Sequence, residues 1–400
     1  MTAWYDKAIF YHMYPLGMTG APFANPYPVS DGTADGTRDV SSDSRMDELM
    51  QWIPYLESLH ISAIYIGPLF ESSTHGYDTR DFRLIDRRLG TNVSFRSFVD
   101  CCHEHGIRVV VDGVFNHTGR EFFAFRDLQA HRDQSPYAGW YRNVNFGWGS
   151  PLGDSFGYES WHGIWELPCL NHRNPEVRNY LLDTVRFWVQ EFDIDGIRLD
   201  CAGDLSFEFM QELRRLANEI KPEFWLMGEV IHGEYARWVN PQMLHSVTNY
   251  EMHKSIYSAH NDHNYFELAH NVRRLEAVGR DLYTFVDNHD EDRIASKLLN
   301  PAHLAPLYTL LFTLPGIPSI YYGSEWGQTG KKEQESDDSL RPEFTKPMPN
   351  GLTKYIKKLI SIRNQSSALQ KGEFKELVLT NKQFVFERND QQERIIVALN

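Results

Sequence analysis

The stretch RVVVDGVFNH, residues 108–117, joins a run of valines to a polar cluster. A short run rich in β-branched residues is typical of a strand that is buried on both faces of a parallel sheet. Similar runs occur along most of the chain. Together they predict eight strands: Ile9–Tyr14, Ala63–Ile66, Arg108–Val114, Gly196–Asp200, Phe224–Glu229, Ser246–Thr248, Tyr283–Asp287 and Ser319–Tyr322.

Amphipathic stretches lie between most of these strands and predict helices. Pro175 suits the first turn of one of them, with Asn174 as its cap. Eight strands with intervening helices favour an α/β protein with a (β/α)8 TIM barrel. A doubly wound sheet is the alternative, although it would not need eight strands so evenly paired with helices. The expected helices are Arg45–Leu59, Ser94–His105, Pro175–Phe192, Phe207–Lys221, Asn264–Val278 and Ala302–Leu314.

Two segments depart from the repeat. Residues 118–173 are aromatic and rich in glycine, without a helical period, and are expected to form an insertion after the third strand. After a last helix near 352–364, the end of the chain alternates as short strands. We therefore expect a barrel from 1–117 and 174–348, an inserted domain at 118–173, and at 349–400 the last barrel helix with a short, possibly incomplete all-β domain.

The composition limits the possible functions. The 400 residues are 42% hydrophobic and 24% charged, which excludes disorder, collagen and coiled coils. The net charge of −14 argues against nucleic acid and anionic membranes as partners and is compatible with a neutral substrate. Four cysteines without zinc or disulfide spacing, and no signal peptide or spanning segment, favour the cytoplasm. The oligomeric state is left open.

Polar residues gather where the predicted strands end, which is where barrel enzymes carry their chemistry. Arg198 and Asp200 end the fourth strand, Glu229 the fifth, and His289 and Asp290 follow the seventh. Arg198 and Asp200 are two residues apart on a strand and so point to one face, where the arginine is expected to lower the pKa of Asp200. Neighbouring carboxylates should push Glu229 towards its protonated form. Two such carboxyls, roughly 5–5.5 Å apart, suit a retaining glycosidase, with Asp290 as a third carboxylate that stabilises charge.

Each of these features also has a purely structural explanation. An isolated Arg-x-Asp is more often a buried ion pair than a catalytic site, and Asn116-His117 after a strand is often a turn. Structural charges should scatter over both ends of a barrel. Because four strand ends carry such groups here, an active site is the better interpretation.

The short sequence blocks around these residues resemble the α-amylase family of glycoside hydrolases. The resemblance covers residues 9–325, most of the chain, and implies a (β/α)8 barrel, a protruding domain after strand three and a C-terminal β-sandwich. The blocks appear in the family's order: AIYIGPLFES at 63–72, HGYDTRDF at 75–82, DGVFNH at 112–117, LPCLN at 167–171, GIRLDCAGD at 196–204, GEV at 228–230, FVDNHD at 285–290 and GIPSIYYGSE at 316–325.

The resemblance also implies roles for individual residues. Asp200 would be the nucleophile, Glu229 the acid/base and Asp290 the stabiliser of the transition state. The other matched residues would position Asp200 or bind the sugar in the cleaved position: Arg198 would orient Asp200, His117 and His289 would bind hydroxyls, Tyr77 would stack under the ring, and Asp78 would support the same subsite.

Within the family, the sequence is most similar to enzymes that cut maltodextrins and cyclodextrins inside the cell. Those enzymes commonly carry an additional N-terminal domain, and the chain is expected to lack room for it. We therefore expect a retaining hydrolase of the α-1,4 bonds of a neutral α-glucan. An α-glucan transglycosylase would use the same residues. A metal-dependent barrel hydrolase and a non-catalytic glucan-binding protein are the alternatives from other classes.

No cofactor is expected. Many amylases bind Ca²⁺ through an Asn that matches Asn116, an Asp in the LPDLN block and a backbone carbonyl after the nucleophile block. Here the Asp position is Cys169 and the last block reads Gly203-Asp204. A thiol is a poor calcium ligand, so the sequence predicts no calcium at this site. The segment 31–39 is compatible with two alternatives. It could bind a divalent ion between Asp31, Asp35 and Asp39, or it could equally be a solvated turn.

Aromatic residues are frequent in the insertion. They could form stacking platforms for glucose units, or the core of a segment that has few helices. We expect most to be core and one or two to line the cleft. These residues are Tyr137, Trp140, Tyr141, Phe146, Trp148, Trp161 and Trp165.

Overall fold

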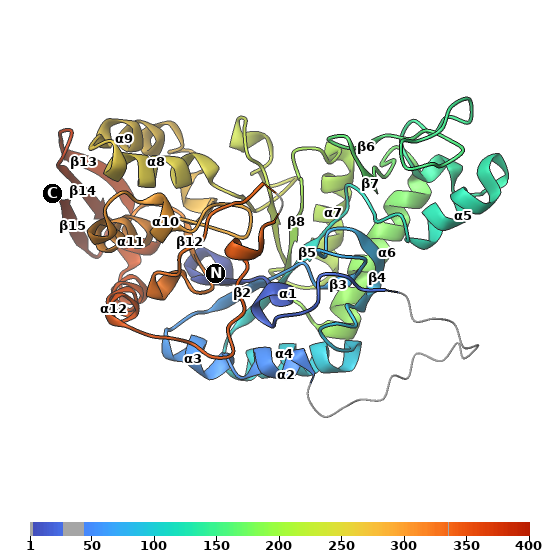
Figure 1. Cartoon of the computed structure of the whole chain (residues 1–400). Coiled ribbons are helices and arrows are strands. Elements are labelled where there is room, and N and C mark those ends of the chain that lie inside the picture. Colours follow the sequence, from blue (N-terminus) through green and yellow to red (C-terminus); the bar gives the residue numbers. More distant parts are fainter. Residues whose placement is uncertain (1–2, 27–43, 335) are drawn as a thin grey trace.

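The computed structural model describes residues 3–26, 44–334 and 336–400. Its centre is a parallel sheet of eight strands in the order β10-β9-β8-β5-β2-β1-β12-β11. Three of these strands, β2, β5 and β8, are labelled near the middle of Figure 1. A single parallel bridge between Thr248 and Tyr283 joins the two edge strands and closes the cylinder. The predicted TIM barrel is confirmed. Its strands are β1 (Phe10–Met13), β2 (Ala63–Ile66), β5 (Arg108–Gly113), β8 (Gly196–Leu199), β9 (Trp225–Gly228), β10 (Ser246–Val247), β11 (Tyr283–Thr284) and β12 (Ile317–Tyr321).

Both faces of the barrel sheet are buried, which explains why its strands are apolar throughout. In β5, Val110 points into the cylinder, where it joins a small cluster with Trp225 and Met227. Val109 and Val111 point outward and join the larger core between the sheet and the surrounding helices. A strand that buries alternate residues in two different cores has no polar face, so the sequence shows a continuous run.

Helices surround the barrel in nearly the predicted order. Asn174 caps α6 by accepting from the backbone N of Glu176 at 2.9 Å, as predicted. The expected helix 45–59 is divided into two, because Pro54 lacks the N–H that would continue the first helix. The helices are α1 (Pro15–Met18), α2 (Arg45–Met50), α3 (Ile53–Ser58), α4 (Asn92–Glu104), α6 (Pro175–Phe192), α7 (Phe207–Ile220), α8 (Tyr250–Asn261), α9 (Tyr265–Arg274), α10 (Ile294–Lys297), α11 (Leu304–Thr313), α12 (Gly351–Gln365) and α13 (Ser367–Lys371).

The insertion, residues 118–173, projects at the right of Figure 1. It contains a helix that was not expected, α5 (Phe123–His131), and a small hairpin of β6 (Ser160–Trp161) and β7 (Ile164–Pro168). A second two-stranded sheet, β3 (Phe70–Ser72) with β4 (Thr79–Ile85), follows β2. Six of the seven aromatics behave broadly as expected: Trp140 and Tyr141 are buried, and Tyr137, Phe146 and Trp165 pack on the core, whereas Trp161 lines a cleft. Trp148 is 49% exposed.

The C-terminal strands form an antiparallel sheet at the opposite end of the molecule (Figure 1). They are β13 (Glu373–Leu379), β14 (Phe384–Asn389) and β15 (Arg394–Leu399). Arg388 of β14 is fully buried and donates to the carbonyl of Thr313 at 2.7 Å, which ties this sheet to the end of α11. The all-β end of the chain is confirmed. The exact domain boundaries at 117, 173 and 348 stay a prediction.

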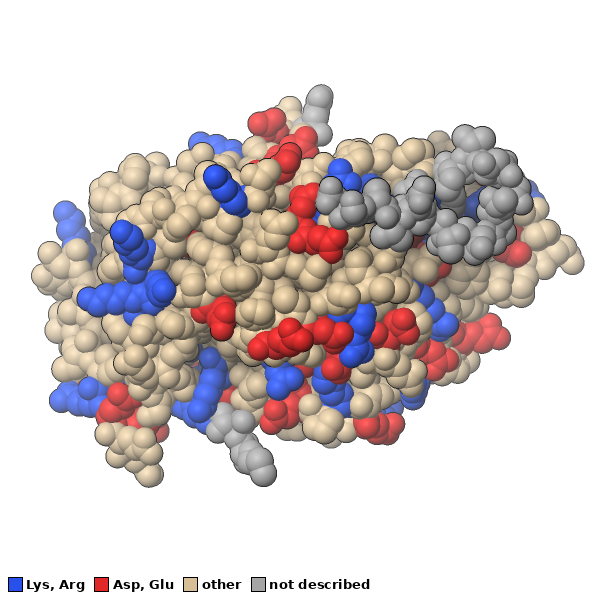
Figure 2. All heavy atoms as spheres, turned by 90° about the horizontal axis from the view of Figure 1, so that it is seen from below, with Lys and Arg blue, Asp and Glu red and all other residues tan. Residues whose placement is uncertain are grey.

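The surface carries acidic and basic side chains interspersed along the face seen from below in Figure 2. Every helix in the described part of the chain is too short or too polar to cross a membrane. The residues Asp31, Asp35 and Asp39, considered above for a divalent ion, lie outside the described ranges.

Candidate active site

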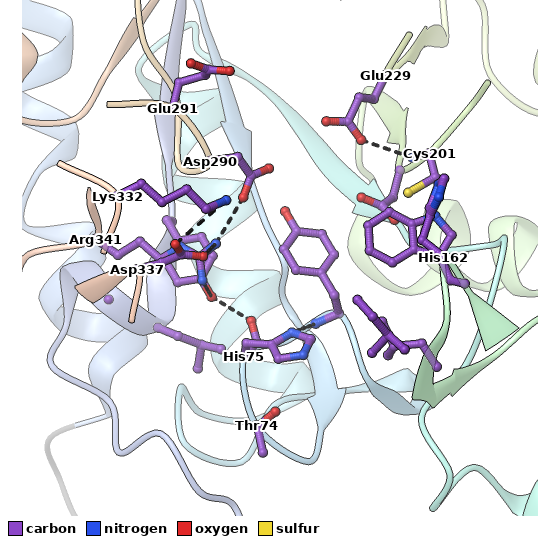
Figure 3. A pocket seen from close by; sticks show the side chains of 18 of the residues that line it. Thr74, His75, His162, Cys201, Glu229, Asp290, Glu291, Lys332, Asp337 and Arg341 are labelled. Atoms are coloured by element: carbon purple, nitrogen blue, oxygen red, sulfur yellow. Dashed lines mark hydrogen bonds and ion pairs between the residues drawn. The ribbon is translucent and has the colours of Figure 1, made fainter. Parts of the chain in front are cut away.

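A cleft of about 1180 Å³ opens at the carboxyl ends of the barrel strands. Five of the predicted site residues line it, each from a different segment: Tyr77, His117, Asp200, Glu229 and Asp290. In Figure 3, Glu229 and Cys201 occupy one side of the cleft and Asp290 the other. The structure therefore brings together side chains that are up to 213 positions apart in the numbering of the sequence, Tyr77 to Asp290.

Arg198 is the electrostatic centre of the floor. Its Nη1 donates to Asp112 Oδ1 and to Asp200 Oδ1, both at 2.8 Å, and its Nη2 lies 2.9 Å from Glu229 Oε2. Arg198 is 3% exposed and does not line the cleft itself. One guanidinium thus serves three carboxyls, and it fixes the positions of two of the proposed catalytic groups.

Asp200 and Glu229 form a close pair. A carboxylate oxygen of each lies within 4.8 Å of the other and of Cys201 Sγ. Glu229 is held from two directions, because the backbone N–H of Cys201 donates to its Oε2 at 3.1 Å and the hydroxyl of Tyr250 donates to its Oε1 at 3.2 Å. The pair therefore has little freedom to separate.

The electrostatics of Asp200 differ from the expectation. Burial, together with the nearby charges of Glu229 and Asp112, raises the pKa of Asp200 to about 8, even though Arg198 opposes the shift. Arg198 acts in the expected direction, but burial has the larger effect, so the net pKa of Asp200 is raised and not lowered. The physical reason is that a single cation does not compensate three buried carboxyls, so the cluster retains a proton near neutral pH.

Asp290 has the opposite surroundings. Burial alone would raise its pKa, but His289 and Arg341, aided by Arg198, hold the pKa of Asp290 well below its usual range. Nε2 of His289 lies 3.0 Å from Asp290 Oδ2, and Nη2 of Arg341 lies 3.0 Å from Oδ1. Asp290 is therefore a fixed negative charge facing the Asp200–Glu229 pair across the cleft.

The remaining predicted residues lie beside these groups. The hydroxyl of Tyr77 is 2.5 Å from Nε2 of His289, and the two rings are stacked with centroids 5.6 Å apart. Burial lowers the pKa of His117 to about 3, so its ring is neutral, and its Nε2 has no hydrogen-bond partner in the part of the chain that the structure describes. Asp78 does not line the cleft; it is buried and accepts from the hydroxyl of Thr74 at 2.7 Å, which holds the adjacent wall.

Some residues of the site carried no recognisable sequence signal. Arg341 lies beyond the last family block, yet it contacts Asp290 and also Asp337 at 3.1 Å (Figure 3). Tyr250 opens α8 and reaches Glu229 from there. Its position after the sixth predicted strand was the only available indication, because the loops after barrel strands line the active site.

Metal binding is not favoured by the donor atoms. Within the described ranges, the one group of three potential ligands is Asp200, Cys201 and Glu229, and Arg198 already lies against both carboxylates. At the family's calcium position, Nη2 of Arg142 lies 3.3 Å from Asn116 Oδ1, and the neighbouring residue of the LPCLN block is a thiol. A bound guanidinium and a thiol do not fit calcium. The absence of calcium stays a prediction.

Comparisons with known proteins agree with this geometry. Residues 27–351 match the family described as "Alpha amylase, catalytic domain", so the chain belongs to the α-amylase family of glycoside hydrolases. It is 32% identical to a cyclomaltodextrinase of Thermoanaerobacter pseudethanolicus, covering 99% of this chain and 70% of that protein. It is 30% identical to an intracellular maltogenic amylase of Bacillus subtilis strain 168, covering 92% of this chain and 62% of that protein.

A solved structure gives the same assignment. The ligand-free cyclic alpha-maltosyl-(1→6)-maltose hydrolase of Arthrobacter globiformis is similar with a TM-score of 0.83 at 26% identity, covering 99% of this chain and 91% of that one. The predicted family, the barrel and the assignment as a glycoside hydrolase are confirmed.

Proposed function

We propose that this protein hydrolyses α-1,4-glucosidic bonds of maltooligosaccharides and cyclodextrins with retention of anomeric configuration. The observation that carries the mechanism is the approach of Asp200 and Glu229 to within 4.8 Å between carboxylate oxygens. Carboxyls about 5–5.5 Å apart suit a double displacement, whereas inversion needs a wider gap that admits a water. The substrate class is supported by the names of the relatives.

In the first step, a carboxylate oxygen of Asp200 attacks the anomeric carbon while Glu229 donates its proton to the departing glycosidic oxygen. The C–O bond to the leaving sugar breaks and an ester to Asp200 forms. In the second step Glu229 takes a proton from water, and the resulting hydroxide displaces Asp200. Glu229 is protonated again, so the enzyme returns to its starting state.

The proton balance of the empty site is compatible with this cycle. The Asp200–Glu229 pair retains one proton near neutral pH, because burial raises the pKa of Asp200. The reaction requires that proton on Glu229 and the negative charge on Asp200, beside Arg198. Asp290 stays ionised through the cycle and stabilises the positive charge that develops on the sugar ring.

Two other assignments belong to this proposal. The roles of Tyr77 as the stacking surface and of His117 as a hydroxyl ligand are supported by their place at the cleft. His289 does not line the cleft, and its role as a hydroxyl ligand is supported only by its contact with Tyr77. A cytoplasmic location is supported by four free cysteines and by the intracellular relative. A transglycosylase would use the same groups, with a sugar hydroxyl in place of water, and no contact among the described residues of the cleft favours it specifically.

The test incubates the protein with maltotriose, β-cyclodextrin, pullulan, isomaltose and trehalose, and follows the anomers of the first products by NMR. We expect α-anomers from maltotriose or cyclodextrin, and loss of turnover in Asp200→Asn and Glu229→Gln. β-anomers as first products, or near-normal turnover in either variant, would contradict the mechanism. Longer oligosaccharides at high substrate concentration would identify a transglycosylase.

A further inference from the structure

Arg142, in the insertion, connects parts of the chain that are distant in sequence. Its Nε donates to the carbonyl of Leu170 at 2.9 Å, and its Nη1 lies 3.3 Å from Glu159 Oε1. Its Nη2 donates to Asn116 Oδ1 at 3.3 Å and to the carbonyl of Asp204 at 3.4 Å. One guanidinium therefore contacts the loop after β5, both sides of the insertion and the loop that follows Asp200.

The position of this guanidinium is fixed by the backbone. The N–H of Arg142 donates to the carbonyl of Cys169 at 3.0 Å, and its own carbonyl accepts from the N–H of Glu159 at 2.9 Å. The side chain is 27% exposed, so it lies mostly inside the contact between insertion and barrel. A planar, permanently charged group with five donors suits several oxygens that converge from different directions.

These oxygens include the two that the family resemblance assigns to calcium, Asn116 Oδ1 and the carbonyl after the nucleophile block, here that of Asp204. The third ligand position is Cys169, a thiol. A calcium ion placed among these oxygens would lie next to the positive charge of Arg142, which opposes binding. The chain therefore supplies a cation of its own where the family's metal does not fit.

The loop that Arg142 contacts leads directly from Asp200. Asp204 is held at a second point, because the indole N–H of Trp161 in the insertion donates to its Oδ2 at 3.1 Å. The same loop contains Cys201, whose backbone N–H holds Glu229. A change in the position of this loop would thus reach both members of the catalytic pair.

We propose that Arg142 is a positioning residue, a built-in cation that fastens the insertion to the barrel and holds the loop after Asp200 in register with Glu229. It acts through hydrogen bonds to oxygens of other segments and does not touch the substrate. The proposal rests on the proposed function for its effect on catalysis. Its effects on stability and on calcium response do not depend on that function.

The test compares Arg142→Ala with Arg132→Ala, the same change within the insertion. Among the described residues, the guanidinium of Arg132 donates to two carbonyls of the insertion itself, those of Ser155 and Phe146. We expect kcat/KM on maltotriose to fall on the order of tenfold in the Arg142 variant and by much less in the control. Guanidinium ions at millimolar concentration should restore part of this loss, and the neutral isostere urea should not. Equal losses in the two variants, or no difference between guanidinium and urea, would overturn the proposal.

Calcium provides the second measurement. We expect the Tm of the wild-type protein to be unchanged by EDTA or by millimolar Ca²⁺, and the Tm of Arg142→Ala to lie below that of Arg132→Ala. A wild-type Tm that rises with Ca²⁺ but no longer does so in Asn116→Ala, or a Tm of Arg142→Ala at or above that of Arg132→Ala, would overturn the proposal. If the wild-type protein cleaved none of the glucans, the proposed function would fail, and these Tm comparisons would still decide the role of Arg142.

Discussion

Replacing Asp200 by Asn should remove activity and at the same time stabilise the protein at alkaline pH. Burial raises the pKa of Asp200 from 3.8 to about 8, a difference of about four units. A carboxyl whose pKa is higher in the folded state than in the unfolded state destabilises the folded state when it ionises. The loss of folding free energy is therefore absent below pH 4, near the pKa in the unfolded state, and increases until the pH passes 8, the pKa in the folded state. At 1.36 kcal/mol per unit, the upper bound is about 5 kcal/mol.

The expected gain is smaller than this bound. The amide of Asp200→Asn adds donors to a buried site, and any donor that stays without a partner offsets part of the gain. We expect about 2 to 4 kcal/mol at pH 8–9. With 400 residues and an unfolding entropy of about 2.1 cal/mol/K per residue, this corresponds to a Tm increase of about 2 to 5 °C. The loss of the nucleophile should lower kcat at least about 10⁴-fold.

The matched control is Asp195→Asn, at the other end of the same barrel strand. Burial raises the pKa of Asp195, but His103 and Lys221, at 2.7 and 3.0 Å from its carboxylate, outweigh this effect and hold the pKa at about 2. This group stabilises the fold above pH 4, and its loss should cost about 2 kcal/mol at pH 7 and nothing below pH 2. The kcat of Asp195→Asn at 25 °C should stay within about twofold of wild type, because Asp195 lies at the end of the barrel opposite the active site.

The assay is differential scanning calorimetry of the three proteins from pH 5 to 9, with kcat on maltotriose. The Tm difference between Asp200→Asn and wild type should increase with pH and level off above pH 8, whereas Asp195→Asn should lie below wild type throughout. The reasoning about the buried cluster would be refuted if the Tm difference between Asp200→Asn and wild type did not change with pH. A Tm of Asp200→Asn below that of wild type at pH 9 would also refute it.

Three further predictions concern other parts of the molecule. Glu229→Gln should lower kcat on maltotriose about 10²- to 10⁴-fold but affect α-maltosyl fluoride much less, since fluoride leaves without a proton; equal losses on both substrates would exclude the acid role. Arg388→Met should lower the Tm by about 1–4 °C and leave kcat unchanged, because the carbonyl of Thr313 loses a buried hydrogen-bond donor. An unchanged Tm would show that Arg388 does not stabilise the contact between the C-terminal sheet and α11. Gly67→Ala should lower the Tm by about 1–4 °C and should also lower kcat/KM. The added Cβ would lie 2.4 Å from Asp112 Cβ, and Asp112 contacts Arg198. A fully active variant would show that Asp112 can move aside.

The sequence predicted the barrel strands well because each of them is buried on both faces. The helices were less uniform. α8 was not expected because its buried face is largely polar: His253, Ser255, Ser258 and His260 are buried beside Met252 and Ile256, which hides the hydrophobic period. α5 was missed for a related reason, since it packs its apolar side against other aromatics within an insertion that is aromatic throughout.

The positions of Asp200, Glu229 and Asp290 in one cleft could be predicted from strand ends alone, because the carboxyl ends of parallel strands meet at the same end of a barrel. Their catalytic roles stay predictions. The ionisation of Asp200 could not be predicted, since it depends first on burial and then on how many carboxyls share Arg198, and the contact of Asp112 with Arg198 is known only from the structure. Arg341 was likewise out of reach, because nothing in its own segment indicates a contact with a residue 51 positions away.

The single bridge between Thr248 and Tyr283 makes the cylinder unequally stiff around its circumference. β8 and β9, which carry Asp200 and Glu229, are joined through four paired positions, whereas the strands on either side of the bridge pair through two each. Asp290 follows β11, next to this weak seam. We therefore expect the gap between Asp290 and the other two carboxyls to adjust around a sugar ring more readily than the spacing of Asp200 and Glu229.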